Sequence, residues 1–188
     1  MKLKIVKMKS VKSTNDIAIK LIKRKLTKAT LILSLIQRNG RGTMGKKWVS
    51  QKGNLFVTIF FEIQNAKINF KQFAILNAYL IKKIIKRYTS KKVYIKWPND
   101  LLIKKKKVCG ILQEVIDNNN KKFLIVGVGI NTNISPNNKG FNSTSLKCMR
   151  KKYINNNQVL NDVKKLYENF IQNINKYTFV ELKKKLAK

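Results

Sequence analysis

Short apolar runs dominate the pattern of this sequence. Three of them, at residues 30–36, 53–61 and 123–130, are rich in β-branched and aromatic side chains, which is typical of buried β-strands. Apolar side chains recur at helical spacing in three other segments, at residues 70–88, 159–174 and 180–186. Because 188 residues with 44% hydrophobic content can bury an adequate core, we expect one folded domain and exclude a disordered polycation.

The middle of the chain predicts a further pair of strands. Residues 93–96 form a short run that Pro98 ends, residues 101–103 resume it, and residues 108–116 are expected to return after a hairpin turn. The turn, residues 104–107, consists of four lysines. Nothing in the residues themselves distinguishes one of these lysines from the others.

A glycine-rich loop, residues 37–48, follows the first of the buried strands. Gly40, Gly42 and Gly45 lie within six positions, and Arg41 lies between the first two. Glycine lets a backbone approach a ligand closely, successive backbone N–H groups can hold an anion, and an arginine adds a fixed cationic fork. The loop therefore predicts an anion site at a strand end, although a plain surface turn is an equal alternative on composition alone.

The loop matches neither common phosphate-binding motif. A Walker motif ends in a lysine followed by a hydroxyl residue, whereas Lys46 and Lys47 follow Gly45 and no hydroxyl is available to hold a metal. In a Rossmann fingerprint the glycines open a helix, and residues 46–50 are not expected to do so. The glycines alone thus indicate no familiar nucleotide fold.

The whole loop does resemble the signature Gln-x-x-Gly-Arg-Gly-x-x-Gly-x-x-Trp of biotin protein ligases. Further segments resemble that family's other blocks, in the same order along the chain: Ser13-Thr14-Asn15, Lys96-Trp97-Pro98-Asn99-Asp100, Lys107-Val108-Cys109-Gly110-Ile111-Leu112 and Gly127-Val128-Gly129-Ile130-Asn131. The resemblance covers roughly residues 10–146, and several ordered blocks are far more specific than one.

The resemblance implies a fold and an activity. The fold is the α+β fold of biotin ligases and class II aminoacyl-tRNA synthetases, a mixed β-sheet flanked by helices. The resemblance implies that residues 1–188 form a single catalytic domain, without the helix-turn-helix domain of some relatives and without the family's small C-terminal β-barrel. The implied enzyme makes biotinyl-5′-AMP from biotin and ATP, with Mg²⁺ carried on the phosphates. It then transfers biotin to a lysine in the acceptor domain of acetyl-CoA carboxylase or another biotin-dependent carboxylase.

The resemblance also assigns roles to residues. Lys107 and Arg41 would be the catalytic cations at the α-phosphate, and Asp100 would orient the incoming amine. The implied biotin-binding residues are Ser13, Thr14, Asn15, Gln37, Gly40, Arg41, Gly42, Thr43, Lys107 and Gly110. The implied nucleotide-binding residues are Arg41, Lys46, Trp48, Asn99 and Asn131. No protein-bound metal site is implied.

Two of these positions depart from the family pattern. Thr43 stands where the family usually has a second arginine, so a cation that helps to retain the adenylate is missing. Lys46 replaces another common arginine, which keeps the charge but loses the fork geometry. We therefore expect biotinyl-AMP to escape more readily from this chain than from its relatives.

Simpler explanations exist for some of the motif residues. Ser13 and Thr14 stand at the start of an expected helix, where hydroxyls often cap the backbone N–H groups. Asp100 follows Asn99 after a proline, so it suits a turn with an ion pair to a neighbouring lysine. However, only eight acidic residues occur in the chain, and an aspartate lodged among lysines invites a functional explanation.

The net charge of +34 is extreme, and 42 of the residues are lysine or arginine. A basic nucleic-acid-binding protein on a decayed ligase scaffold is one alternative, but no DNA- or RNA-binding motif is visible and we favour lysine-rich composition as the cause. A lipoate or octanoate ligase of the same fold is the second alternative. We expect no specific DNA partner and no membrane partner, because no apolar run approaches membrane-spanning length.

The two cysteines, Cys109 and Cys148, lack metal-ligand spacing and no histidine is present. Free, buried thiols in a reducing compartment are the simplest explanation, and we expect a cytoplasmic protein.

Overall fold

The structure is a computed structural model that describes residues 1–63, 66–136, 142–176 and 178–187. The strands are β1 (Lys4–Val11), β2 (Thr30–Gln37), β3 (Gly40–Arg41), β4 (Lys47–Trp48), β5 (Leu55–Glu62), β6 (Val93–Lys96), β7 (Asp100–Ile103), β8 (Lys106–Asn118) and β9 (Lys121–Ile130). The helices are α1 (Thr14–Lys23), α2 (Phe70–Lys86), α3 (Leu146–Arg150), α4 (Asn156–Asn173) and α5 (Phe179–Ala187), with a 3₁₀ turn at Thr43–Gly45.

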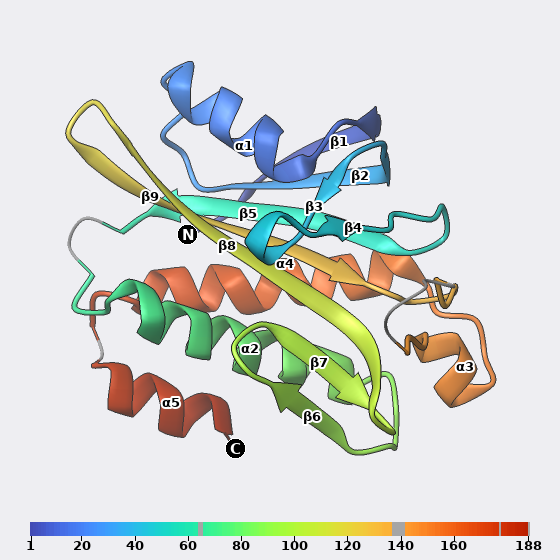
Figure 1. The fold of residues 1–188 in the computed structure, drawn as a ribbon. Helices are drawn as coiled ribbons and strands as arrows, with labels where there is room; N and C mark the ends of the chain where they lie inside the picture. The colour runs from blue at the N-terminus through green and yellow to red at the C-terminus, as the bar shows by residue number, and fades with distance from the viewer. Residues whose placement is uncertain (64–65, 137–141, 177, 188) are drawn as a thin grey trace.

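Seven of the strands form one mixed sheet in the order β1-β2-β5-β9-β8-β7-β6. Strands β1 and β2 are parallel, with α1 as the crossover between them, and every other neighbouring pair is antiparallel. Strands β3 and β4 form a separate two-stranded ribbon. The prediction of a mixed sheet flanked by helices is confirmed (Figure 1).

Helices cover both faces of the sheet (Figure 1). On one face, α1 packs Ala18 and Ile22 against Ile32, Phe60 and Phe123 in a small apolar cluster. On the other face α2 and α4 pack on the sheet and α5 packs on α2, which together bury the larger core. Burial of both faces explains why the central strands are apolar runs with little alternation.

The sequence prediction for the lysine turn needs one refinement. Lys104 and Lys105 alone make the turn, with φ values of 48° and 62°, while Lys106 and Lys107 already belong to β8. Two central residues with positive φ are typical of tight two-residue hairpins. Lys104 and Lys105 therefore lie at the tip of the β7–β8 hairpin, and Lys106 and Lys107 lie in strand β8.

Neither cysteine forms a disulfide. Cys109 is buried, as predicted, but Cys148 is exposed because it lies on the outer side of the short helix α3, so the expectation of two buried thiols is wrong. Among the described residues, no helix combines the length and apolar character that crossing a membrane requires.

Candidate active site

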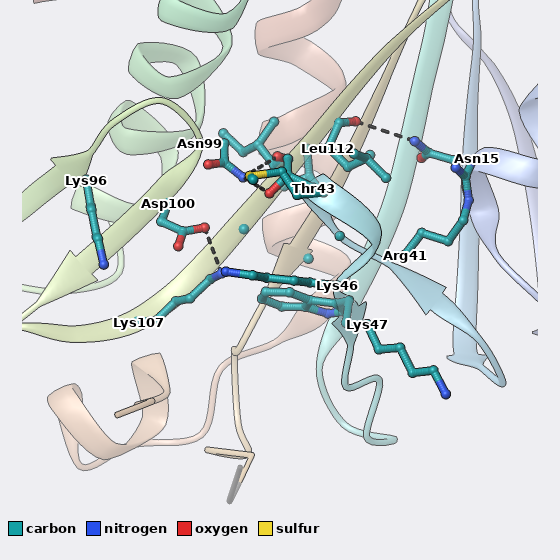
Figure 2. A pocket seen from close by; sticks show the side chains of 18 of the residues that line it. Asn15, Arg41, Thr43, Lys46, Lys47, Lys96, Asn99, Asp100, Lys107 and Leu112 are labelled. Carbon is teal, nitrogen blue, oxygen red and sulfur yellow. Dashed lines mark hydrogen bonds and ion pairs between the residues drawn. The ribbon is translucent and has the colours of Figure 1, made fainter. Parts of the chain in front are cut away.

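A cavity of about 510 Å³ lies where the start of α1, the glycine loop and strands β7, β8 and β9 meet. Most of the predicted site residues line it, and these are Ser13, Thr14, Asn15, Gln37, Arg41, Gly42, Thr43, Lys46, Trp48, Asn99, Asp100, Lys107 and Gly110. Figure 2 shows side chains from these separate segments around one space. Segments that are far apart in the sequence therefore form one site.

The start of α1 supplies a polar wall. The backbone N–H and the hydroxyl of Thr14 donate to Gln37 Oε1 at 2.8 and 2.9 Å, and the Asn15 amide lies 2.6 Å from the buried Thr58 hydroxyl. Ser13 precedes the helix but its side chain makes no capping hydrogen bond. Capping therefore does not explain Ser13, whose side chain is buried at the cavity wall.

Glycines in β8 and β9 form the floor. Gly110 and Gly129 are paired across these strands, and the Trp48 ring lies against both: a Cβ atom at Gly110 would be 2.6 Å from the ring, and one at Gly129 would collide with it. Asn15 lies in the same way against Gly127. These glycines are required because side chains approach the strand backbone closely.

Lys107 and Asp100 form an ion pair across β7 and β8. Lys107 Nζ lies 2.7 Å from Asp100 Oδ1, and both side chains are about one-fifth exposed, at 20% each (Figure 2). Lys107 Nζ also lies 5.3 Å from the centre of the Trp48 ring, within the range of a cation–π contact. The backbone of Lys107 is held by Asn142 and Thr144 through hydrogen bonds of 2.9 Å each.

Arg41 is held by two carboxylates that were not predicted as site residues. Its Nη1 and Nη2 donate to the two oxygens of Glu114 at 2.8 Å each, and its Nε lies 2.9 Å from Asp16 Oδ1. Hydrogen bonding to Glu114 is the largest cause that raises the pKa of Arg41 above its ordinary value. The scarcity of acidic residues, used above for Asp100, was the available signal for Asp16 and Glu114 too.

Two predicted residues lie outside the cavity lining. Gly40 is buried in the β3–β4 ribbon, where a Cβ atom would lie 2.7 Å from the Trp48 carbonyl oxygen. Asn131 is 1% exposed; its N–H donates to Val108 and its carbonyl accepts from Leu146, both within 2.9 Å. Both residues therefore pack behind the cavity wall and do not line the cavity itself.

Other residues line the cavity that were not assigned a role. These further lining residues include Met44, Lys47, Trp97 and Leu102. Lys105 also lines the cavity, whereas its neighbour in the turn, Lys104, does not. The positive φ of Lys105 belongs to the tight turn, and residue types alone could not reveal which turn lysine faces the cavity. Within the described residues, no group of three or more His, Cys, Asp or Glu side chains could hold a metal ion.

Known proteins resemble this chain in sequence and in fold. The bifunctional ligase/repressor BirA of Bacillus subtilis is 33% identical over 127 residues, which is 66% of this chain and 39% of that protein. The biotin–[acetyl-CoA-carboxylase] ligase of Paracoccus denitrificans is 31% identical over 122 residues, or 63% of this chain and 50% of that protein. This chain therefore spans at most half the length of either relative.

A solved structure supports the same relationship. The biotin protein ligase from Aquifex aeolicus, in complex with biotin and ATP, superposes with a TM-score of 0.82 at 28% identity, over 97% of this chain and 76% of that one. The sequence profile of the biotin/lipoate A/B protein ligase family matches residues 8–131. From the profile match, the relatives and the shared fold it follows that this chain belongs to the biotin/lipoate A/B protein ligase family.

Proposed function

We propose that this protein is an ATP-dependent biotin ligase, which activates biotin as biotinyl-5′-AMP and transfers it to a lysine of a carboxylase acceptor domain. The observation that carries the proposal is that the Lys107–Asp100 pair and the polar start of α1 line one and the same cavity. Resemblance to ligases named for biotin favours this substrate within a family that also includes lipoate ligases.

The polar wall suits the ring end of biotin. Thr14, Asn15 and Gln37 bring hydroxyl and amide groups to one side of the cavity, and a ureido group needs such donors and acceptors when it leaves water. Gly110 and Gly129 carry no side chains, and the Trp48 ring lies against both, so the aliphatic tail of biotin would run along the floor toward Lys107 in the space that the ring now fills. Binding of the tail along this floor therefore requires the Trp48 ring to move aside.

The first step joins two anions, because the biotin carboxylate attacks the α-phosphate and pyrophosphate leaves. Cations must offset the negative charge that gathers there. Lys107 is placed for this role, and Lys46, Lys96 and Lys105 line the same cavity with no ion pair among the described residues. Mg²⁺ would enter on the ATP phosphates, the usual arrangement for this ion.

The second step is attack of a lysine amine on the mixed anhydride, with AMP as the leaving group. The amine must be uncharged when it attacks. Asp100 forms an ion pair with Lys107 at 2.7 Å, so it can orient the incoming amine beside the reacting carbonyl once that amine has lost its proton to solvent. The amide bond forms as the bond between the carbonyl carbon and the phosphate oxygen breaks, and the second proton of the amine passes to solvent. As AMP leaves, the cationic side chain of Lys107 stabilises the negative charge on the AMP phosphate.

The test measures pyrophosphate release from ATP with biotin alone, with lipoate alone and with neither. Biotin-dependent release is the expected result, and lipoate should support little. Release that depends on lipoate and not on biotin would assign the chain to the other branch of the family. No release with either acid would contradict ligase activity.

A further inference from the structure

Glu114, on β8, makes an unusually dense set of charged contacts beside the cavity. Its Oε1 accepts from Arg41 Nη1 at 2.8 Å, and its Oε2 accepts from Arg41 Nη2 at 2.8 Å and from Asn15 Nδ2 at 2.7 Å. From this geometry we infer that Glu114 is a positioning residue: it fixes the glycine loop and the start of α1 around the cavity before any ligand arrives.

The loop depends on such attachments. Strands β3 and β4 pair with each other and, among the described strands, with no strand of the seven-stranded sheet. A two-stranded ribbon on its own is only marginally stable. The two hydrogen bonds between the Arg41 guanidinium group and the Glu114 carboxylate, called the Arg41–Glu114 fork, attach the ribbon to β8. The contact of Arg41 Nε with Asp16 at 2.9 Å attaches it to α1. The Trp48 ring of the ribbon also packs on the strand glycines. Removal of the fork should therefore loosen the ribbon.

The chemistry of the contact requires a carboxylate. Glu114 accepts from three N–H donors with two oxygens, which an ionised carboxylate can do because it carries only acceptors. A glutamine at this position would turn one acceptor into a donor, which would face an N–H of Arg41 or of Asn15. The substitution Glu114→Gln thus breaks the geometry while it keeps nearly the same volume.

The distribution of acidic residues supports the same inference. The whole chain has eight acidic residues, and three of them, Asp16, Asp100 and Glu114, pair with cations that line this cavity. Arg41 donates hydrogen bonds to Glu114 from Nη1 and Nη2, and its Nε forms an ion pair with Asp16. Its main contribution is to hold the loop in place, and an ordered loop reduces the entropy that ligand binding costs.

The first test measures how well acrylamide quenches the fluorescence of Trp48, which reports whether the loop is held in place, and it needs no ligand. In a Trp97→Phe background the only remaining tryptophan is Trp48, on the ribbon. Glu114→Gln should raise the acrylamide quenching constant of Trp48 by about twofold or more, because local opening exposes the ring. Glu62→Gln is the matched control, since it breaks an ion pair with Lys121 on the same sheet away from the cavity. Equal quenching in Glu114→Gln and the parent would overturn the inference.

The second test rests on the proposed function. Glu114→Gln should raise the KM for biotin about tenfold while kcat for pyrophosphate release stays within about twofold, because lost preorganisation weakens binding more than chemistry. Glu114→Asp, which keeps the charge, should recover part of the affinity. An unchanged KM would contradict the inference. If wild type releases no pyrophosphate, the proposed function fails, and the quenching comparison still decides the role of Glu114.

A folding failure of Glu114→Gln would not leave the question open. Arg41→Gln breaks the same fork from the ribbon side and should raise the quenching of Trp48 to a similar degree. Normal quenching in a folded Arg41→Gln protein would show that the fork does not hold the loop, and the inference would be wrong.

Discussion

Individual residues at the site divide into those that short motifs can reveal and those that only the fold brings together. Asp100 and Lys107 belong to separate motif blocks, and the structure pairs them at 2.7 Å. The pairing of Arg41 with Glu114 spans 73 positions, and no local pattern reports a contact of that kind. Sequence reasoning therefore named Asp100 and Lys107, which line one cavity, but missed Asp16 and Glu114, the carboxylates that hold Arg41.

Lys107→Ala should reduce pyrophosphate release roughly 100- to 1,000-fold, the usual cost of removing one group that stabilises developing charge. Lys104→Ala is the matched control, because Lys104 lies in the adjacent turn and does not line the cavity. Lys105→Ala should have an intermediate effect that appears mainly in the KM for ATP. Steady-state assays of the three variants check this order, and a greater loss in Lys104→Ala would contradict the site.

Because Thr43 is uncharged, we predict that biotinyl-AMP escapes readily from the site. Its side chain lines the cavity and its hydroxyl lies 3.3 Å from the Asn99 amide, so it offers no charge to a phosphate. A charge-assisted hydrogen bond contributes roughly 1.5–3 kcal/mol, and each 1.4 kcal/mol is about tenfold. Thr43→Arg should therefore slow the escape of biotinyl-AMP by about ten- to a hundredfold.

The measurement for Thr43 is biotin labelling of a bystander protein, in the presence of biotin and ATP but without an acceptor domain. Wild type should label the bystander and its own lysines more than Thr43→Arg does. Equally low labelling by both proteins would mean that another group, such as Lys46, retains the intermediate.

Elements were predictable where a local pattern determines them. The buried strands β2, β5 and β9 and the helices α1, α2, α4 and α5 match the apolar runs and helical spacings of the sequence to within a few residues. The parallel pairing of β1 with β2 and the β3–β4 ribbon were not predicted, because strand pairing over long distances leaves no local signal. The short helix α3 was missed for a similar reason, since it is shorter than two turns.

The attachment of the N-terminus to α4 leads to a pH-dependent prediction. Glu168 accepts from the Leu3 N–H at 2.7 Å and pairs with Lys164 at 2.6 Å. Although burial opposes ionisation, these contacts together lower the pKa of Glu168 below its ordinary value. A carboxyl whose folded pKa is depressed stabilises the fold above its unfolded pKa, and the effect is lost as the pH falls through the folded pKa.

Glu168→Gln should therefore lower the Tm at pH 7, and the difference from wild type should shrink below about pH 4. Thermal unfolding followed by circular dichroism at both pH values checks this. Glu62→Gln, which breaks a more exposed pair, should change the Tm little. A difference for Glu168→Gln that is as large at pH 3 as at pH 7 would rule out the carboxylate as its cause.

At the scale of the whole molecule, the sequence blocks and the fold indicate the same family. Neither of them explains the net charge of +34. Lysines occur in nearly every segment, which fits a composition bias better than a dedicated nucleic-acid surface. Binding to DNA should be weak, insensitive to sequence and steeply reduced by salt, because counterion release drives it.

Fluorescence anisotropy with two unrelated DNA duplexes at low salt and at about 150 mM salt tests this expectation. Similar affinity for both duplexes, falling sharply with salt, is the expected result. A strong preference for one duplex at the higher salt concentration would indicate a specific DNA site and revive the nucleic-acid-binding alternative.

Transfer of biotin to an acceptor domain tests the proposed ligase activity of this protein as a whole. The protein is incubated with biotin, ATP, Mg²⁺ and a purified biotin acceptor domain, and the acceptor is weighed by intact-protein mass spectrometry. We predict a mass increase of one biotin, which requires ATP and is absent when the target lysine of the acceptor is replaced by arginine. An acceptor that stays unmodified while an established biotin ligase modifies it under the same conditions would contradict the account.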